Sequence, residues 1–394
     1  MDNITQLVRK QYETWVYPEP VTDIAALVAQ GGHLRSDPSL YRAQFWPERA
    51  HDPRMSILVA GCGTSQAAYL AYTNPQATVV GIDLSETSLR NSAALKEKHG
   101  LANLDLHALD LHEASSLGRR FDLITCTGVL HHLPDPEAGL RALVEVLEDD
   151  GVINLMLYGR YLRLGVYMVQ EALRRLGIGQ DPPGVAFARG LVEVLPESHV
   201  VQRYVRNTPE LRHDGAIVDT FLHPQDRAYT VPEILALLSN CGLVFQGWID
   251  NLEYYPDGPF DGVSPLYERV MALPDAEQWA VVELLTQARG THRFLARRRP
   301  GFAIDIDGPG LADLVAARMP LLQADDRDGL VTVKREWHSM GLQGLERSLF
   351  LAIDGRRTVG AILALCGADD ASAATGRAFF RQMWRLGHIT LSRA

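Results

Sequence analysis

The sequence predicts an α/β fold in which helices cover a doubly wound, mostly parallel sheet. Two observations indicate this class. Between residues 55 and 158, apolar runs of strand length alternate with segments of helical spacing. The first run ends in Gly61 and Gly63, and the second run ends in Asp83. Buried parallel strands show such near-continuous apolar runs, and sheets of this class bind ligands beyond the carboxyl ends of their strands.

The elements of this sheet follow in order along the chain. Residues 149–151, Asp-Asp-Gly, predict a tight turn before the last strand. The predicted strands cover residues 57–60, 78–82, 104–108, 121–125 and 152–157, and the predicted helices between them cover residues 65–73, 85–99 and 136–147.

Further segments lie on both sides of this core. Those that follow it complete a predicted domain over residues 51–299, and those that precede it form a separate cap. Residues 1–50 show short helical patterns, including one at 40–46, and predict an N-terminal helical cap. A helical pattern at 162–176 and mixed helical spacing beyond it predict a substrate-side insert over about 160–230. Thr230 and Glu233 form the pattern of a capping box at the start of a helix that ends at Asn240. The last predicted elements are a strand at 243–249, a helix at 275–288 and a closing strand at 291–296.

Residues 300–394 differ in character and predict a small α+β C-terminal domain. A polar turn at 325–329 precedes a short strand at 330–333. Three stretches of helical spacing and a final short strand follow, at 345–353, 358–365, 376–386 and 389–391. This order of elements is typical of a winged-helix-like module.

Composition narrows the class of protein. The net charge is −10, from 38 basic and 48 acidic side chains, which disfavours a nucleic-acid partner. The four cysteines lack C-x-x-C spacing, so neither a disulfide framework nor a zinc cluster is expected. There is no N-terminal signal pattern and no apolar run of membrane-spanning length. We therefore predict a cytoplasmic protein without membrane contact.

The glycine-rich turn indicates a nucleotide-like ligand. Gly61-x-Gly63, with an acid twenty residues later, opens both dinucleotide-binding and S-adenosylmethionine-binding domains. Gln66 stands at the position of the third glycine of the dinucleotide fingerprint, which disfavours a pyrophosphate ligand. Asp83 could accept hydrogen bonds from both hydroxyls of a ribose. Alternatively, it only caps the helix that follows.

The region around the fourth strand carries a family resemblance. Residues 121–133 read FDLITCTGVLHHL, and residues 146–153 read VLEDDGVI. Together with residues 57–66 and 80–84, these segments resemble the class I S-adenosylmethionine-dependent methyltransferases, which have a Rossmann-like fold. The resemblance covers residues 55–158 closely and residues 1–299 in outline. It implies an enzyme that uses S-adenosyl-L-methionine and releases S-adenosyl-L-homocysteine.

The resemblance also implies where the cofactor binds. Gly61 and Gly63 would face its methionine part, Asp83 its ribose and Leu84 its adenine, while Asp110 would lie near the adenine amino group. Two tyrosines of the N-terminal segment are expected to close over the cofactor. The complete predicted set is Tyr12, Tyr17, Gly61, Cys62, Gly63, Thr64, Gln66, Asp83, Leu84, Asp110, Leu111, Thr127 and Gly128.

Acceptor-side residues are expected after the fourth and fifth strands and in the insert. Methyl transfer needs alignment above all, and it needs a general base only where the acceptor must lose a proton early. The two histidines after the fourth strand either serve this role or only structure their loop. We predict His131, His132, Tyr158 and His223 as catalytic candidates, and Tyr161, Asp219 and Tyr229 as substrate-binding candidates. Loop packing is the alternative for the insert residues. No metal-ligand spacing links them, so no metal is predicted.

The C-terminal region bears on the acceptor. Residues 351–359 and 386–389, with Phe379, Phe380 and Trp384 between them, resemble peptide-binding winged-helix modules and the tail domains of some protein methyltransferases. We therefore predict methyl transfer to a nitrogen or oxygen of a peptide or protein side chain. One alternative is a small-molecule acceptor, such as a metabolite or natural product, with the tail used for homodimerisation. Another is a cofactor-binding regulatory protein without catalysis.

Overall fold

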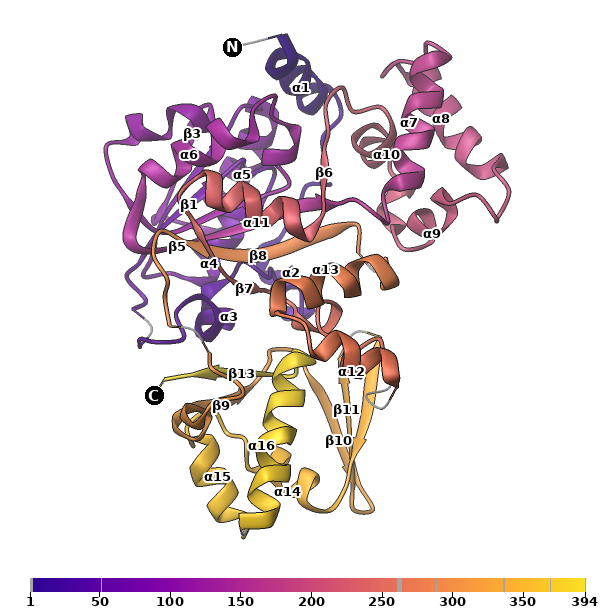
Figure 1. Ribbon diagram of the computed structural model, residues 1–394. Coiled ribbons are helices and arrows are strands. Elements are labelled where there is room, and N and C mark those ends of the chain that lie inside the picture. The colour runs from indigo at the N-terminus through magenta and orange to yellow at the C-terminus, as the bar shows by residue number, and fades with distance from the viewer. Residues whose placement is uncertain are drawn as a thin grey trace. The chain divides into compact units, whose positions relative to one another are not determined.

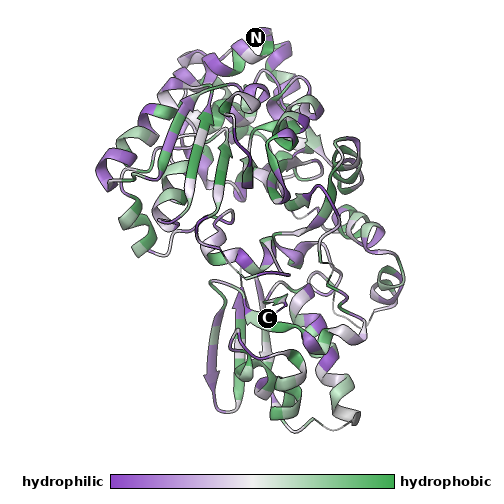
Figure 2. Cartoon of the chain, turned by 90° about the vertical axis from the view of Figure 1, so that its left-hand side faces the viewer, coloured by the Kyte–Doolittle hydropathy of each residue, from purple (hydrophilic) through white to green (hydrophobic). Residues whose placement is uncertain are grey.

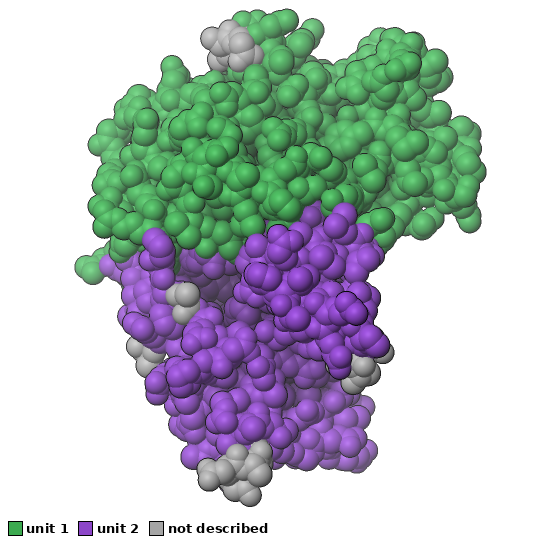
Figure 3. All heavy atoms as spheres, in the orientation of Figure 1, with its two compact units in different colours: residues 1–36, 53–245, 287–299 green, residues 37–52, 246–286, 300–394 purple. Residues whose placement is uncertain are grey.

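The computed structural model describes residues 3–50, 52–260, 264–287, 289–302, 304–335, 337–368 and 370–393. The chain forms two compact units, which Figure 3 distinguishes by colour. Unit 1 contains residues 1–36, 53–245 and 287–299, and unit 2 contains residues 37–52, 246–286 and 300–394. This grouping differs from the three segments predicted as domains, 1–50, 51–299 and 300–394, which remain a prediction.

The main sheet has eight strands and is mostly parallel (Figure 1). Strand β1 pairs in parallel with both β2 and β4, and β8 pairs antiparallel with β5. The predicted doubly wound α/β fold is therefore confirmed. The predicted closing strand at 291–296 is β8, but β7 lies beyond it at the edge of the sheet. In sheet order the strands are β3 (Leu104–Ala108), β2 (Thr78–Asp83), β1 (Ser56–Ala60), β4 (Phe121–Thr127), β5 (Leu147–Gly159), β8 (Thr291–Arg297) and β7 (Val244–Trp248), and β6 (Ala228–Tyr229) pairs with β5.

The predicted turn at residues 149–151 is wrong, because β5 begins earlier than its apolar run. Pairing between β4 and β5 moves from Phe121–Leu147 directly to Leu123–Val152. The polar residues between Leu147 and Val152 form an irregularity inside the strand rather than a turn before it. Such bulges depend on the partner strand, which the local sequence does not show.

Helices surround the sheet and form the insert of unit 1. The helices α7 to α10 lie together in Figure 1 and share an apolar core that includes Val166, Val201 and Phe221. The helices of unit 1 are α1 (Asn3–Thr14), α2 (Ile24–Ala29), α4 (Gln66–Thr73), α5 (Glu86–His99), η1 (Leu111–Leu117), η2 (Leu130–His132), α6 (Pro136–Glu145), α7 (Leu164–Arg175), α8 (Pro182–Val194), α9 (Val201–Arg206), η3 (Pro209–Arg212), α10 (Asp214–Phe221) and α11 (Val231–Asn240).

Burial explains the apolar runs of the sequence. Ile57, Leu58, Val59 and Ala60 of β1 are completely buried, as expected for a central strand covered on both faces. Figure 2 shows the same concentration of hydrophobic residues along the strands of the main sheet. No helix among the described residues is both long enough and apolar enough to cross a bilayer.

Unit 2 has a separate apolar core, which includes Val331, Phe350 and Phe380. The predicted polar turn is shorter than expected, because only Asp328 and Gly329 have the left-handed backbone of a two-residue hairpin. The winged-helix resemblance remains a prediction. The elements of unit 2 are α3 (Pro38–Phe45), η4 (Asn251–Glu253), α12 (Pro265–Met271), α13 (Asp275–Thr286), η5 (Pro309–Asp313), β9 (Val315–Arg318), β10 (Gln323–Arg327), β11 (Leu330–Arg335), β12 (His338–Leu342), α14 (Gly344–Ala352), α15 (Val359–Leu365), α16 (Asp370–Arg385) and β13 (Ile389–Ser392), where β10–β11–β12 and β13–β9 form antiparallel sheets.

The predicted capping box is present at the start of α11. The Thr230 side chain accepts from the Glu233 N–H, and the Glu233 carboxylate accepts from the Thr230 N–H at 2.8 Å. We expect Thr230→Ala to lower the free energy of unfolding by about 1 kcal/mol, because the Glu233 N–H loses its side-chain acceptor. Urea denaturation measures the change. Ser239→Ala, an exposed position on the same helix, is the matched control, and an equal loss there would contradict the capping role.

Candidate functional site

In the turn after β1, backbone atoms rather than side chains lie at the carboxyl end of the strand. Gly61 and Gly63 both have positive φ angles, 70° and 56°. A Cβ atom at Gly61 would lie 2.3 Å from Val129 Cγ2, so a side chain there would clash. The N–H groups of Gly61 and Cys62 both donate to the Ile82 carbonyl at 2.9 Å, which fixes the turn against β2. The requirement for glycine in this motif is therefore conformational and steric.

Asp83 ends β2 beside this turn. Its Oδ2 accepts from the Gly63 N–H at 2.8 Å, and its Oδ1 accepts from the Ser85 N–H at 2.8 Å. Each oxygen keeps a further lone pair with which to accept from a ligand. Burial raises the pKa of Asp83, while these hydrogen bonds oppose the rise. The cap of α5 is Ser85, so Asp83 is not needed for capping.

The other predicted cofactor residues lie around the same strand ends. Gln66 accepts from the Thr127 hydroxyl at 3.1 Å and donates to Ser36 Oγ, which links α4 to β4. Asp110 caps η1 by accepting from the His112 N–H. Gly128 has a φ of 82°. Cys62, Thr64 and Leu111 are buried, and Leu84 is half-buried.

The N-terminal segment lies against these strand ends. The Thr64 hydroxyl donates to the Pro18 carbonyl at 3.3 Å. Glu13 accepts from the Glu86 N–H at the start of α5. Tyr17 is half-buried, and burial raises its pKa. The structure thus places the segment with Tyr12 and Tyr17 beside the predicted cofactor residues, and closure over the cofactor stays a prediction.

A buried polar cluster, here called the imidazole cluster, lies in unit 1 and joins residues from α1, η2, β5 and the insert. Asp219 of α10 joins two tyrosines, because its Oδ1 accepts from the Tyr12 hydroxyl at 2.8 Å and its Oδ2 from the Tyr158 hydroxyl at 3.0 Å. The structure therefore brings together all four predicted catalytic candidates and one predicted substrate residue. The members of the cluster are Tyr12, His131, His132, Tyr158, Asp219 and His223.

Ring stacking holds this cluster together. The rings of His131 and Tyr158 stack at 3.7 Å, and those of His132 and His223 stack at 3.8 Å. The guanidinium of Arg163 lies 3.6 Å from the centre of the Tyr158 ring. Two groups this close to one ring centre must occupy its opposite faces, so Tyr158 is held between His131 and Arg163.

Arg163 is a residue that the sequence reasoning missed. It is 1% exposed, forms an ion pair with Asp226 at 2.8 Å and donates to the Tyr204 hydroxyl at 2.9 Å. Its partners lie 41 and 63 residues further along the chain. No local pattern marks such a pair, and an arginine between two leucines gives no signal of burial.

Burial keeps the cluster's titratable rings neutral. It lowers the pKa values of His131, His132 and His223, and it raises those of Tyr12 and Tyr158. At neutral pH the imidazoles are therefore uncharged, and a neutral imidazole has one nitrogen that can accept a proton.

The cluster also contains a set of side chains of metal-ligand type. One ligand atom each from His132, Asp219 and His223 lies within 4.8 Å of the others. However, the Gln225 N–H donates to His223 Nδ1 at 3.1 Å, which places the ring proton on Nε2. That Nε2 is a hydrogen-bond donor rather than a metal ligand. The prediction of no metal remains a prediction.

Two predicted substrate residues lie outside the contacts of the imidazole cluster described above. Tyr229 of β6 is buried, and its ring lies 4.8 Å from the guanidinium of Arg227. Tyr161 is half-buried in the turn after β5. Their role in substrate binding stays a prediction.

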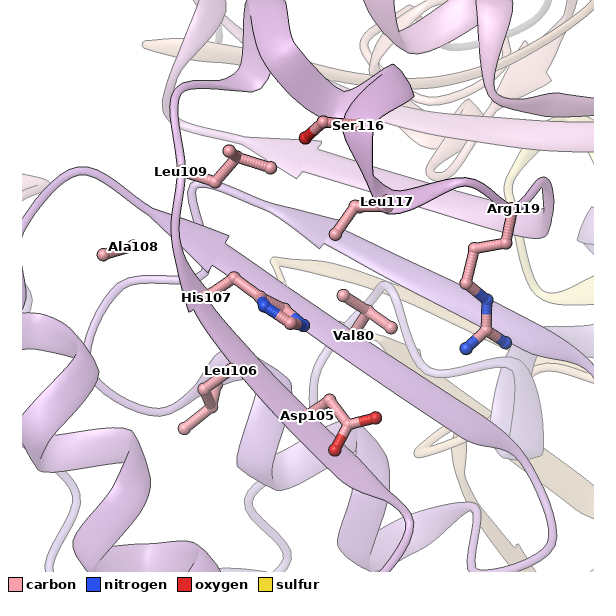
Figure 4. A pocket seen from close by; sticks show the side chains of 9 residues that line it. All are labelled: Val80, Asp105, Leu106, His107, Ala108, Leu109, Ser116, Leu117 and Arg119. Atoms are coloured by element: carbon pink, nitrogen blue, oxygen red, sulfur yellow. The ribbon is translucent and has the colours of Figure 1, made fainter.

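A cavity of about 620 Å³ lies at the edge strand β3 (Figure 4). Its walls include the polar side chains Asp105, His107, Ser116 and Arg119. None of the residues lining it is a predicted site residue. This cavity therefore plays no part in the site described above.

Comparison with known proteins bears on the identity of the chain. A family model described as a methyltransferase domain matches residues 51–162. An uncharacterized protein of Synechococcus sp. is 31% identical over 309 residues, which cover 76% of this chain and 73% of that protein. The chain belongs to the class I S-adenosylmethionine-dependent methyltransferases.

Other similarities of this methyltransferase are shorter or structural. The ubiquinone biosynthesis O-methyltransferase of Neisseria meningitidis is 31% identical over 100 residues, covering 25% of this chain and 41% of that protein. The structure of PKMT2 from Rickettsia typhi in complex with AdoHcy has a TM-score of 0.65 at 14% identity, covering 91% of this chain and 76% of that one. The structural match shows the same fold.

The enzyme uses S-adenosyl-L-methionine, and its residues fit this cofactor. Gly61 and Gly63 leave the turn without side chains, and a Cβ at Gly63 would meet only Pro18, at 3.9 Å. Asp83 would hold the ribose with its remaining lone pairs. When bound, the cofactor supplies an electrophilic methyl group on a positively charged sulfur.

The pH dependence of stability should reveal the buried neutral histidines of the methyltransferase. Because the folded state lowers the pKa of His131, the unfolded state binds the proton first, and stability falls as the pH drops below about 6.5. We expect this one group to cost about 1.4 kcal/mol between pH 7.5 and 5.5. Urea denaturation at pH 7.5 and 5.5 measures it.

The control for this prediction is a comparison of variants. His131→Phe, which keeps a ring against Tyr158, should show a smaller loss of stability at pH 5.5 than the natural protein. His107→Asn, at an exposed position of β3, should keep the full loss. Identical pH dependence in all three proteins would contradict the prediction.

Proposed function

We propose that this methyltransferase transfers a methyl group to a nitrogen or oxygen of a peptide or protein side chain. The observation that carries the proposal is unit 2, a second compact unit with its own apolar core. The residues predicted to bind the cofactor all belong to unit 1. A separate folded unit of this size is best explained by recognition of a large acceptor.

The surface of unit 2 supports a recognition role. Large apolar side chains are exposed there, among them Trp337 at 55% and Leu365 at 62%. Exposed aromatic and aliphatic side chains are typical anchors of peptide and protein interfaces. The fold of PKMT2 matches 91% of this chain, so the likeness extends beyond unit 1, which holds less than two thirds of the residues.

The imidazole cluster supports the chemistry. Methyl transfer is an in-line displacement, for which orientation contributes about 7–11 kcal/mol. Asp219, held by Tyr12 and Tyr158, offers a rigid carboxylate that can orient a polar acceptor group. The neutral His132 can take a proton from the acceptor, a role that typically adds about 10²–10⁴-fold to a rate.

Methyl-group labelling tests the proposal. The full-length protein is incubated with S-adenosyl-L-methionine labelled at the methyl group and with whole-cell extract, and products are separated by size. We expect label in protein-sized material that a protease converts to labelled peptides. Asp83→Ala, which removes the predicted ribose partner, is the control without transfer. Label confined to small molecules would contradict the peptide acceptor and favour a small-molecule acceptor instead.

A further inference from the structure

The backbone of a single residue, Gln225, determines which nitrogen is protonated in two stacked imidazoles. The carbonyl of Gln225 accepts a hydrogen bond from His132 Nδ1 at 3.0 Å, because a carbonyl can only accept. The N–H of the same residue donates to His223 Nδ1 at 3.1 Å, because an N–H can only donate. His132 is therefore protonated on Nδ1 and His223 on Nε2. The two neutral rings have opposite tautomers.

The stacking geometry places the two remaining nitrogens side by side. The rings lie 3.8 Å apart with an angle of 25° between their planes. Both Nδ1 atoms face Gln225, so both Nε2 atoms lie on the opposite side of the stack. His132 Nε2 presents a lone pair there, and His223 Nε2 presents an N–H. The Nε2 atom of His223 is completely buried and has no hydrogen-bond partner among the described residues.

Asp219 lies beside the two histidines. One ligand-type atom from each of the three side chains lies within 4.8 Å of the others. The three side chains thus offer one donor, on His223, beside two acceptors, on His132 and Asp219. A buried N–H group without an acceptor destabilises the folded protein. The N–H of His223 therefore indicates that a ligand atom with a lone pair accepts its hydrogen bond.

We propose, on the basis of the proposed function, that the methyl acceptor is a hydroxyl oxygen. The hydroxyl donates its proton to His132 Nε2 and accepts from the N–H of His223 with one lone pair. Its second lone pair stays free to attack the methyl group. A neutral amine has a single lone pair. If that lone pair accepts from His223, none is left to attack the methyl group. An ammonium group has no lone pair.

The transfer step balances with these groups alone. The oxygen–methyl bond forms as the sulfur–methyl bond breaks, and the electron pair of the broken bond goes to sulfur. The hydroxyl proton passes to His132 Nε2 and later to solvent. The Gln225 carbonyl, which accepts from Nδ1–H, stabilises the charged imidazole in between.

The tautomers can be observed without any reaction. Nitrogen NMR of full-length protein with ¹⁵N-labelled histidine, in the presence of S-adenosyl-L-homocysteine at pH 7.5, distinguishes protonated from unprotonated ring nitrogens. His132→Gln and His223→Gln assign the signals. We expect a proton on Nδ1 of His132 and on Nε2 of His223. The reverse tautomer on either ring, or two charged rings, would overturn the proposal.

Variants at His223 test the donor. Glutamine can place an amide N–H near the position of Nε2, whereas leucine cannot. We expect His223→Leu to lower the rate of methyl transfer about 10-fold, and His223→Gln to lower it less. Circular dichroism checks that both variants fold. Equal rates for both variants and the natural protein would overturn the role of His223.

The methylated atom gives the decisive result. Peptides with a serine, threonine or tyrosine hydroxyl as their sole acceptor are compared with peptides carrying only a lysine amine, and with small phenols and alcohols. Mass spectrometry locates the methyl group, which we expect on oxygen. Methylation of nitrogen would overturn this inference but leave the proposed function intact. Oxygen methylation of small molecules alone would overturn the proposed function but support the hydroxyl acceptor.

Discussion

Replacing Asp83 with alanine is expected to weaken the binding of S-adenosyl-L-homocysteine by at least about 100-fold. The carboxylate would accept hydrogen bonds from two ribose hydroxyls, and hydrogen bonds to a charged group contribute about 1.5–3 kcal/mol each. A loss of about 3 kcal/mol corresponds to more than 100-fold in the dissociation constant. Titration calorimetry on the full-length protein measures this constant directly.

The same substitution also removes hydrogen bonds that fix the turn after β1. Asp83 accepts from the backbone N–H groups of Gly63 and Ser85, so alanine removes the partner of both. Asp83→Asn keeps one oxygen acceptor and should give an intermediate loss of affinity. Asp105→Asn, at an exposed position on the adjacent strand β3, should bind like the natural protein. An affinity of Asp83→Ala within threefold of the natural protein would refute the ribose assignment.

The sequence could indicate that the residues predicted to bind the cofactor lie close together, because their determinants are local. Gly61 and Gly63 follow an apolar strand directly, and Asp83 ends the next strand. Parallel pairing of adjacent strands then brings these residues together without any further information. The backbone angles and the contacts of Asp83 agree with the pattern in the sequence.

The members of the imidazole cluster could be singled out from the sequence only as separate residues. His132, Tyr158, Asp219 and His223 were each identifiable as polar side chains near a strand end or in the insert. Their convergence depends on how the helices of the insert pack, which is a property of the tertiary structure. The contribution of Gln225 is made by its backbone, and a backbone hydrogen bond leaves no trace in residue type.

Long-range packing also explains why the compact units differ from the predicted segments. Helix α3 belongs to unit 2, and it packs against β13 near the other end of the sequence. The Gln246 side chain donates to the carbonyls of Gln44 and Phe45, two hundred residues away in the chain. Composition and periodicity describe single elements, so they could not show that these distant segments fold together.

Replacing Arg163 with alanine is expected to lower the free energy of unfolding by about 3–5 kcal/mol. The substitution leaves the buried carboxylate of Asp226 without its cation, which is the costly way to break a buried ion pair. Urea denaturation measures the loss, and Arg175→Ala, whose ion-pairing side chain is 79% exposed, should change stability by less than about 0.5 kcal/mol. Replacing both Arg163 and Asp226 with leucine should cost less than the single substitution, because no charge is left unpaired. Equal losses for Arg163→Ala and Arg175→Ala would show that the buried pair does not hold Tyr158 and the insert in place.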